Sequence, residues 1–168
     1  MKVNLGCGHK LLAGFVNVDL ADNWSAVQPD VVADVTGPLP FEDGVADEVH
    51  AYHVLEHLYR WQTEEVLKEW TRILRPGGLL VIEVPCLDKI IHYMKTMMER
   101  GTVMDDRLSL WGLYGDPNYK NEAMCHRWCF SRGELSQVLK GIGMTNVTAM
   151  PPKTHQPIRD IRFEATKP

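Results

Sequence analysis

The chain has 168 residues, of which 45% are hydrophobic and 24% are charged, and its formal net charge at pH 7 is -4. This length suits one domain, residues 1–168, whose core needs neither disulfides nor a metal. The acidic balance and the scattered basic residues argue against nucleic acid as the main partner. No apolar run approaches the ~20 residues of a membrane-spanning helix, and the first residues do not form a signal peptide. The sequence does not indicate an oligomeric state.

The cysteine pattern predicts reduced thiols in a cytoplasmic protein. Cys7, Cys86, Cys125 and Cys129 occur without an export signal, and disulfides are rare in that setting. Cys125, His126 and Cys129 lack the second pair of ligands that a usual zinc site has. We therefore assign no metal.

Three short strands near the start each end in groups that can contact a ligand. The strand from Val3 runs into Gly6-Cys7-Gly8, the strand Val16–Asp19 ends on a carboxylate, and Asp30–Asp34 ends on another. Open α/β sheets bind nucleoside ligands beyond the carboxyl ends of their strands, with an acid on the ribose hydroxyls. Only ten residues separate Leu5 from Val16, fewer than the dozen or more that a parallel crossover uses. We expect the first helix to be reduced to a turn around Lys10–Ala13.

The rest of the chain alternates between strands and amphipathic helices. The predicted elements are a strand near 48–52, a helix over 64–75 capped by Thr63 and stopped by Pro76-Gly77-Gly78, a strand over 79–84, a helix from Asp88 to about Gly101, a helix that begins with the capping-box spacing Ser131–Glu134, and strands over 145–150 and 161–165. The last strand alternates apolar and polar residues, which predicts an antiparallel strand near an edge with one solvated face. The fold class is therefore α/β, a doubly wound, mostly parallel seven-stranded sheet with an antiparallel last strand.

Several motifs in this order resemble class I S-adenosylmethionine-dependent methyltransferases, in particular a small, type-11-like methyltransferase domain. The motifs are Asn4-Leu5-Gly6-Cys7-Gly8, Val16-Asn17-Val18-Asp19, Ala33-Asp34, Leu39-Pro40-Phe41, Asp47-Glu48-Val49, His53-Val54-Leu55-Glu56-His57 and Glu69 through Arg75-Pro76-Gly77-Gly78. The resemblance implies S-adenosyl-L-methionine as cofactor and S-adenosyl-L-homocysteine as its product. It continues to Val84-Pro85 and so spans about half of the chain.

The same resemblance implies which residues bind the cofactor. Gly6, Cys7 and Gly8 would pass along its methionine part, Asp19 with Leu20 would bind the ribose, Asp34 and Val35 would flank the adenine, and His53 would lie beside it. Two positions depart from the family pattern: Asn4, also counted as a cofactor contact, replaces the usual acid, and Lys10 replaces the usual third glycine.

Two rival motifs fit less well. A nicotinamide-binding domain needs Gly-x-Gly-x-x-Gly, whose last position is Leu11 here. His53-Val54-Leu55-Glu56-His57 matches an inverted zinc-protease pattern. That pattern needs both histidines on one helical face, whereas His53 is expected at a strand end. A different class of function, a non-catalytic S-adenosylmethionine-binding domain of a larger assembly, stays open.

The acceptor side of the site is expected within residues 86–130. This segment is the internal lid because the sheet begins at residue 3 and leaves no N-terminal helices as cover. Methyl transfer needs alignment and exclusion of water, with a base only for an acceptor that holds its proton tightly. The candidate bases are His126 and His57, and His92 is a third, weaker candidate. We predict that Trp111, Tyr114, His126 and Trp128 line the pocket of a small-molecule acceptor, methylated on O or N. A loose similarity of Trp111–Gly115 through His126 to glycan-biosynthesis relatives favours a sugar or glycan precursor.

Overall fold

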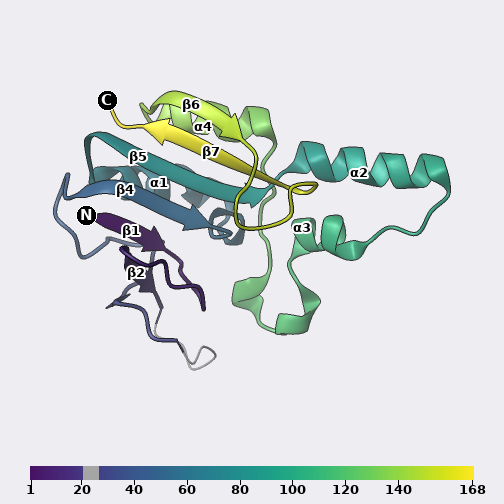
Figure 1. Ribbon diagram of the computed structural model, residues 1–168, viewed down its shortest axis with the longest axis horizontal. Coiled ribbons are helices and arrows are strands. Elements are labelled where there is room, and N and C mark those ends of the chain that lie inside the picture. Colours follow the sequence, from purple (N-terminus) through teal and green to yellow (C-terminus); the bar gives the residue numbers. More distant parts are fainter. Residues whose placement is uncertain (21–26) are drawn as a thin grey trace.

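The computed structural model describes residues 1–20 and 27–168, and in these ranges it forms a seven-stranded sheet of order β3-β2-β1-β4-β5-β7-β6 (Figure 1). The strands are β1 Lys2–Leu5, β2 Val16–Asp19, β3 Val31–Val32, β4 Ala46–Tyr52, β5 Leu74–Pro85, β6 Thr145–Met150 and β7 Asp160–Thr166. The first five run parallel, and β7 pairs antiparallel with both β5 and β6. The predicted α/β class, the mostly parallel seven-stranded sheet and its antiparallel last strand are confirmed.

Within residues 1–20 and 27–168, four α-helices and five short 3-10 segments connect these strands. The helices are α1 Thr63–Arg72, α2 Leu87–Arg100, α3 Leu110–Tyr114 and α4 Arg132–Gly141, and the 3-10 segments are η1 Leu55–His57, η2 Arg60–Gln62, η3 Asp106–Leu108, η4 Pro117–Tyr119 and η5 Glu122–Met124. The helix predicted from Asp88 ends as expected at Gly101, which has φ 63°, and Ser131 caps α4 by accepting from the Glu134 N–H. Within the described ranges, every helix is too short or too polar to cross a lipid bilayer.

One face of the sheet carries the hydrophobic core. Helices α1 and α4 lie behind the sheet in Figure 1 and pack against this face. The core joins alternate residues of the strands to the apolar sides of these two helices, and its largest members are Leu5, Leu67, Trp70, Ile82, Leu135 and Phe163. Removing these side chains from water is the main favourable contribution to folding.

The other face is polar and is crossed by no helix in the described part of the chain. His50 lies on this face, where Nε2 is 3.0 Å from Glu48 and Nδ1 is 2.8 Å from the Tyr52 hydroxyl. Arg162 reaches the same Tyr52 hydroxyl and Glu83, both at 3.4 Å. Because every member is paired, the network tolerates burial.

The connection 151–159 covers part of this polar face in front of β4 and β5 (Figure 1). It is held by the fully buried carboxylate of Glu83, which accepts from the backbone N–H groups of Lys153 at 2.7 Å and Thr154 at 3.1 Å. The prediction of a solvated face on β7 is therefore wrong, since Asp160 and Arg162 are buried under this connection. The alternation of polar and apolar residues correctly indicated which side chains of β7 share a face, but it could not reveal that the connection 151–159 covers this face.

Residues 86–130 leave the sheet and return at one point. Cys86 and Phe130 form an isolated parallel bridge, and the Leu87 N–H donates to the Phe130 carbonyl at 2.9 Å. Between these ends, α2 and α3 extend beyond the carboxyl ends of the parallel strands (Figure 1). Arg159 links the segment before α3 to the sheet, because it donates to the Arg107 carbonyl at 2.9 Å and forms an ion pair with Asp160 of β7.

Two boundaries differ from the sequence prediction. Helix α1 ends at Arg72, because Leu74 already pairs with Ala46 and the Pro76-Gly77-Gly78 segment belongs to β5. Thr63 is the first residue inside α1 and not its cap, and its buried hydroxyl has no hydrogen-bond partner. At the end of α1, strand pairing outweighs the local helix signal; at its start, the 3-10 segment η2 runs directly into the helix.

Acid should destabilise the protein partly through His50. Burial lowers the pKa of His50 from 6.5 to about 4, with Glu48 opposing the change and Arg162 favouring it. Between pH 6.5 and 4 the unfolded chain binds a proton at this position that the folded chain does not, so the free energy of unfolding falls as pH falls. We expect His50→Gln to reduce that fall by about 3 kcal/mol, measured by urea unfolding at a series of pH values. His9→Gln, at an exposed ring, should keep the parent slope, and an unchanged slope in His50→Gln would contradict the assignment.

Candidate functional site

The glycine loop after β1 forms one wall of the site. Gly6 and Gly8 have φ values of 65° and 53°, which glycine adopts without steric cost. The N–H groups of Gly6 and Cys7 both donate to the Val18 carbonyl, at 2.9 and 3.2 Å. Turns and no helix fill residues 6–15, which confirms that the first helix is vestigial.

A buried amide network supports this loop where a helix would otherwise do so. The Asn17 side-chain oxygen accepts from the Asn4 amide at 3.0 Å and from the Leu12 N–H at 2.8 Å. The Asn17 backbone N–H and side-chain amide both donate to Asp30, at 2.8 and 2.9 Å, and these bonds lower the pKa of Asp30. Asn4 thus braces the loop from beneath, and its contact with a cofactor stays a prediction.

Asp19 lies at the end of β2 and links the two strand ends. Its carboxylate accepts from the Gly8 N–H at 2.5 Å and from the Leu20 N–H at 2.7 Å. The next strand end follows closely, because the Ala33 N–H donates to the Asp19 carbonyl at 2.9 Å. Asp34 is exposed and accepts from Thr36. Carboxylates beside an open glycine turn suit the hydroxyls of a nucleoside.

The turn after β4 forms a second wall and contains a buried ion pair. His53, with φ 55°, places Nδ1 2.7 Å from Glu56 and Nε2 3.4 Å from Asp160, while the His155 ring lies 4.0 Å away, tilted by 54°. Burial alone would lower the pKa of His53, but the two carboxylates outweigh it and raise that pKa to about 9. His53 is therefore a cation held between two acids. Its contact with a cofactor stays a prediction.

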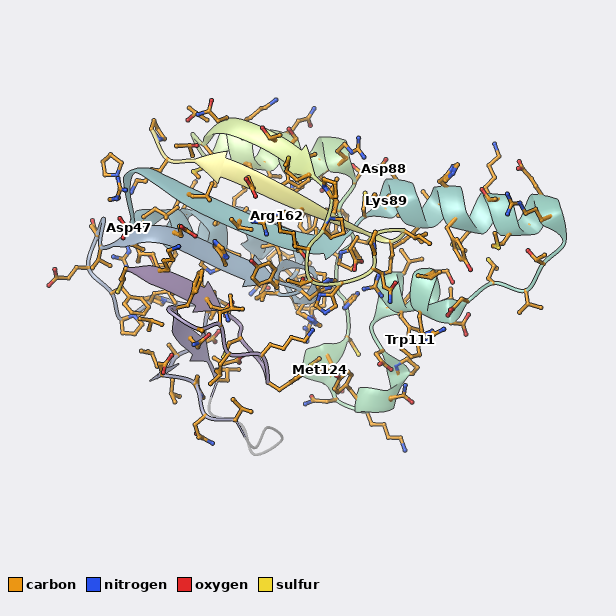
Figure 2. All side chains as sticks on the ribbon, in the orientation of Figure 1. Asp47, Asp88, Lys89, Trp111, Met124 and Arg162 are labelled. Atoms are coloured by element: carbon orange, nitrogen blue, oxygen red, sulfur yellow. The ribbon has the colours of Figure 1, made fainter. Side chains whose placement is uncertain are left out.

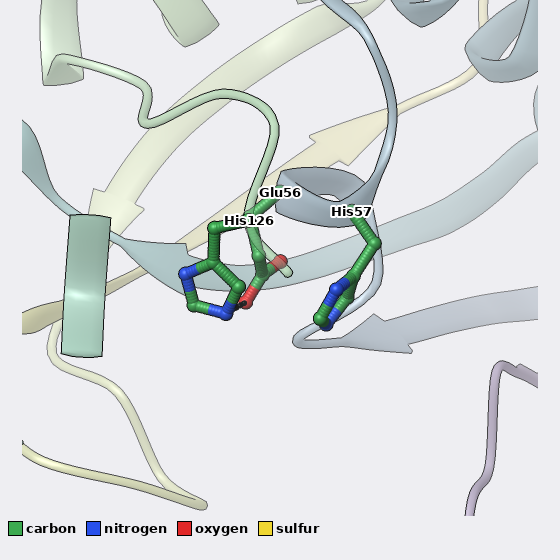
Figure 3. A group of neighbouring side chains, drawn as sticks. All are labelled: Glu56, His57 and His126. Atoms are coloured by element: carbon green, nitrogen blue, oxygen red, sulfur yellow. Dashed lines mark ion pairs between the residues drawn. The ribbon is translucent and has the colours of Figure 1, made fainter. Parts of the chain in front are cut away.

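A third group, Glu56 with His57 and His126, lies next to that pair. Figure 3 shows the three side chains converging, two from η1 and one from the segment that follows η5. The rings of His57 and His126 are 4.9 Å apart at 82°, and His126 Nε2 is 4.0 Å from Glu56 Oε1. Glu56 is fully buried, and its Oε2 has no hydrogen-bond partner among the described residues.

Backbone carbonyls fix the tautomers of both histidines. His126 Nδ1 lies 3.0 Å from the Gly112 carbonyl, and His57 Nδ1 lies 3.2 Å from the Cys125 carbonyl. A carbonyl only accepts, so each Nδ1 donates a proton and each Nε2 of the neutral ring keeps a free lone pair. Burial lowers the pKa of His126, which Glu56 opposes. The geometry therefore presents two basic nitrogens beside a carboxylate.

The returning end of the segment 86–130 positions His126. The backbone N–H groups of Arg127 and Trp128 donate to the Glu56 carbonyl at 2.8 and 3.2 Å, and the Arg127 guanidinium donates to the His57 carbonyl at 2.7 Å. Sequence reasoning chose His57 and His126 but missed Glu56 as a member of the group. The signal was present, since Glu56 is an acid that precedes His57 directly and lies four residues after the end of β4.

The predicted aromatic residues are less closely grouped. Tyr114 is 69% exposed, although its carbonyl accepts from the His126 N–H at 3.2 Å. The Trp128 indole donates to Glu134 of α4 at 3.2 Å, and Trp111 is half-buried on α3. His92 is exposed on α2 (Figure 2 labels the neighbouring Lys89) and lies outside the histidine pair. That Trp111, Tyr114 and Trp128 bind an acceptor stays a prediction.

Comparisons with known proteins concern the family and the fold of the chain. A family described as a methyltransferase domain matches residues 3–82. No curated protein matches the chain. Similar solved structures include a SAM-dependent methyltransferase from Thermotoga maritima (16% identity, TM-score 0.68, 99% of this chain and 82% of that chain) and one from Archaeoglobus fulgidus (16%, 0.63, 99% and 85%). Another is phosphoethanolamine N-methyltransferase 2 from Haemonchus contortus in complex with S-adenosyl-L-methionine (15%, 0.62, 99% and 48%). At these identities the structures show a shared fold.

The glycine loop can be tested by a matched pair of substitutions. A Cβ on Gly6 would overlap the Val54 side chain, whereas one on Gly14, also at positive φ, would meet nothing within 4 Å. Gly14→Ala should cost the strain of a left-handed alanine, about 1–2 kcal/mol. Gly6→Ala adds overpacking and should cost about 1–3 kcal/mol more. Chemical unfolding measures both, and equal losses would mean that the loop and the turn at Val54 are not in contact.

Proposed function

We propose that the chain is a class I S-adenosylmethionine-dependent methyltransferase and that it methylates an oxygen or nitrogen of a small-molecule acceptor between the glycine loop and the histidine pair. One observation carries the proposal. Gly6 touches Val54, so the loop that suits a cofactor directly adjoins the turn that carries Glu56 and His57. Cofactor residues and acceptor-activating residues therefore meet at one edge of the sheet.

The residues of the first wall fit the cofactor. Gly8 has open space where a side chain would stand, and Asp19 and Asp34 end adjacent strands. In the proposal, residues 6–8 contact the methionine part, Asp19 and Leu20 the ribose, and Asp34 with Val35 the adenine. S-adenosylmethionine, when bound, supplies a methyl group on a sulfonium, a leaving group that needs no protonation. The protein's task is then alignment and exclusion of water.

The histidine pair supplies the remaining chemistry for an acceptor that carries a tightly held proton. As the acceptor's lone pair forms its bond to the methyl carbon, the carbon–sulfur bond breaks and its electrons stay on sulfur. His126 Nε2, with a free lone pair and a lowered pKa, takes the acceptor's proton, and His57 is the second candidate. The carbonyls of Gly112 and Cys125 hold the two rings in the required tautomer.

The acceptor class is proposed from the cover of the site. Residues 86–130 would form that cover within one domain of residues 1–168, with Trp111, Tyr114 and Trp128 as contacts. Exposed aromatic faces suit the apolar face of a sugar, which supports a sugar or glycan precursor. A similar structure from Haemonchus contortus is an N-methyltransferase, so nitrogen acceptors belong in any panel. Four free thiols support a reducing, cytoplasmic setting.

Cofactor binding should appear as a shift in thermal stability. A ligand that binds only the native state, at ~100 times its dissociation constant, adds about 2.7 kcal/mol to the free energy of unfolding. We expect S-adenosylhomocysteine to stabilise the parent in this way and to have little effect on Asp19→Ala, because that substitution removes the carboxylate assigned to the ribose. Glu42→Ala, at an exposed acid of the β3–β4 connection, should respond like the parent. A parent that does not respond would refute the assigned cofactor site.

A second experiment tests the proton-accepting role of His126 independently of cofactor binding. Labelled methyl donor is incubated with a panel of small alcohols, amines and sugars, and transfer is measured for the parent and for His126→Ala. Loss of a proton-accepting group should lower kcat by about 10²–10⁴-fold, while the thermal shift with S-adenosylhomocysteine is retained. A variant that transfers methyl at the parent rate would show that His126 takes no part.

A further inference from the structure

Glu56 holds a buried carboxylate oxygen that the protein leaves without a partner. The residue is fully buried; Oε1 accepts from His53, and Oε2 has no hydrogen-bond partner in the described part of the chain. An unpaired buried acceptor costs about 1–3 kcal/mol, a cost that a bound ligand would remove, and the other oxygen, Oε1, lies 4.0 Å from His126 Nε2. The attraction of His53 outweighs burial and lowers the pKa of Glu56 to about 2, which keeps the carboxylate charged.

The two neighbouring histidines have the arrangement typical of metal ligands. A histidine that binds a metal through one ring nitrogen usually donates its other ring N–H to a backbone carbonyl or a carboxylate, which fixes the tautomer. His57 and His126 both do so, through Nδ1 to Cys125 and Gly112, and both keep Nε2 free. Glu56 is oriented in the same way by His53. All three candidate ligands thus have a supporting partner.

We propose that Glu56, His57 and His126 bind one divalent transition-metal ion of the Zn²⁺ type. One ligand atom from each residue lies within 4.8 Å of the others. Zinc bonds of about 2.0–2.2 Å require ligand atoms to lie closer, so the side chains must close by about 1 Å. His57 is only half-buried and has room to move. Two imidazoles and one carboxylate favour Zn²⁺, Co²⁺ or Fe²⁺ over Mg²⁺, which prefers oxygen ligands.

This site differs from the zinc-hydrolase pattern that the sequence contains. In that pattern His53 and His57 would be ligands and Glu56 the general base. In the structure His53 is occupied by Glu56 and Asp160, and the second imidazole is His126 of the segment 86–130. The geometry therefore revises the expectation that the chain binds no metal, but it does not support a zinc-hydrolase function.

The ion would also change how the acceptor is activated, and this part of the inference rests on the proposed function. Three protein ligands leave a coordination position open toward the exposed side of His57, as in catalytic zinc sites. An ion there supplies Lewis acidity to an acceptor oxygen that enters from that side. His57 and His126 would then serve as ligands, and the acceptor's proton would pass to solvent water.

Direct metal binding tests the proposal without any need for turnover. The full chain is treated with a chelator, dialysed and titrated with Zn²⁺ by calorimetry, and Co²⁺ is added separately to record its visible absorption. We expect saturable binding of one ion per chain, a Co²⁺ spectrum typical of imidazole and carboxylate ligands, and no comparable binding of Mg²⁺. No saturable binding of Zn²⁺ or Co²⁺ to the parent would overturn the proposal.

Variants identify the ligands. His126→Ala and Glu56→Gln should each weaken Zn²⁺ binding by at least about 10- to 100-fold, the loss known for supporting partners alone. His92→Ala removes an exposed histidine of α2 and should bind like the parent. Retained secondary structure by circular dichroism shows that each variant is folded. Glu56→Gln also disturbs the ion pair with His53, so His126→Ala is the decisive variant. If folded His126→Ala binds Zn²⁺ with the affinity of the parent, the assignment of the metal ligands is overturned.

Transfer of the labelled methyl group is compared for the parent protein after chelation and after reloading with Zn²⁺. This comparison distinguishes the metal-site inference from the proposed function. Transfer that rises on reloading supports the acceptor-activating role. Equal transfer in both states overturns that role and leaves His126 as the direct base. A parent that binds Zn²⁺ but transfers no methyl group to any acceptor contradicts the proposed function and not the metal site.

Discussion

The functional edge of this protein depends on one buried residue, Glu56. Its carboxylate pairs with His53 at 2.7 Å, and its carbonyl accepts from the N–H groups of Arg127 and Trp128. The first contact fixes the turn after β4, and the second fixes the end of the segment 86–130 on that turn. A buried charge of this kind is retained only where it is paired, and losing one partner leaves the other uncompensated. Glu56 thus couples the sheet to its cover.

The two walls of the site are built from different physical means. The first wall depends on two glycines at positive φ, on the Val18 carbonyl as a shared acceptor, and on the side-chain amides of Asn4 and Asn17, which take the place of a helix. The second wall consists of charged and aromatic side chains from the turn after β4, from the connection 151–159 and β7, and from the segment 86–130. Backbone geometry tolerates little substitution, whereas side chains on a long insertion can vary.

The polar face of the sheet explains how the chain folds with few covering helices. Helices α1 and α4 bury one face, and the other is satisfied by pairs such as His50 with Glu48 and by Glu83 holding the connection 151–159. A parallel sheet is usually buried by helices on both sides. Here hydrogen bonds among side chains and one connection take the place of the second helical layer over the described residues.

The sequence by itself determined the α/β class, the mostly parallel sheet with its antiparallel last strand and the reduced first helix, and it predicted His57 and His126 as site residues. These features depend on local pattern: apolar runs, glycine turns, spacing too short for a crossover. Only the tertiary structure decided what the residues do together. It placed Glu56 between two histidines separated by about 70 positions along the chain, buried the polar face of β7, and moved the end of α1 to Arg72. Such outcomes depend on which distant segments meet, and no local period carries that information.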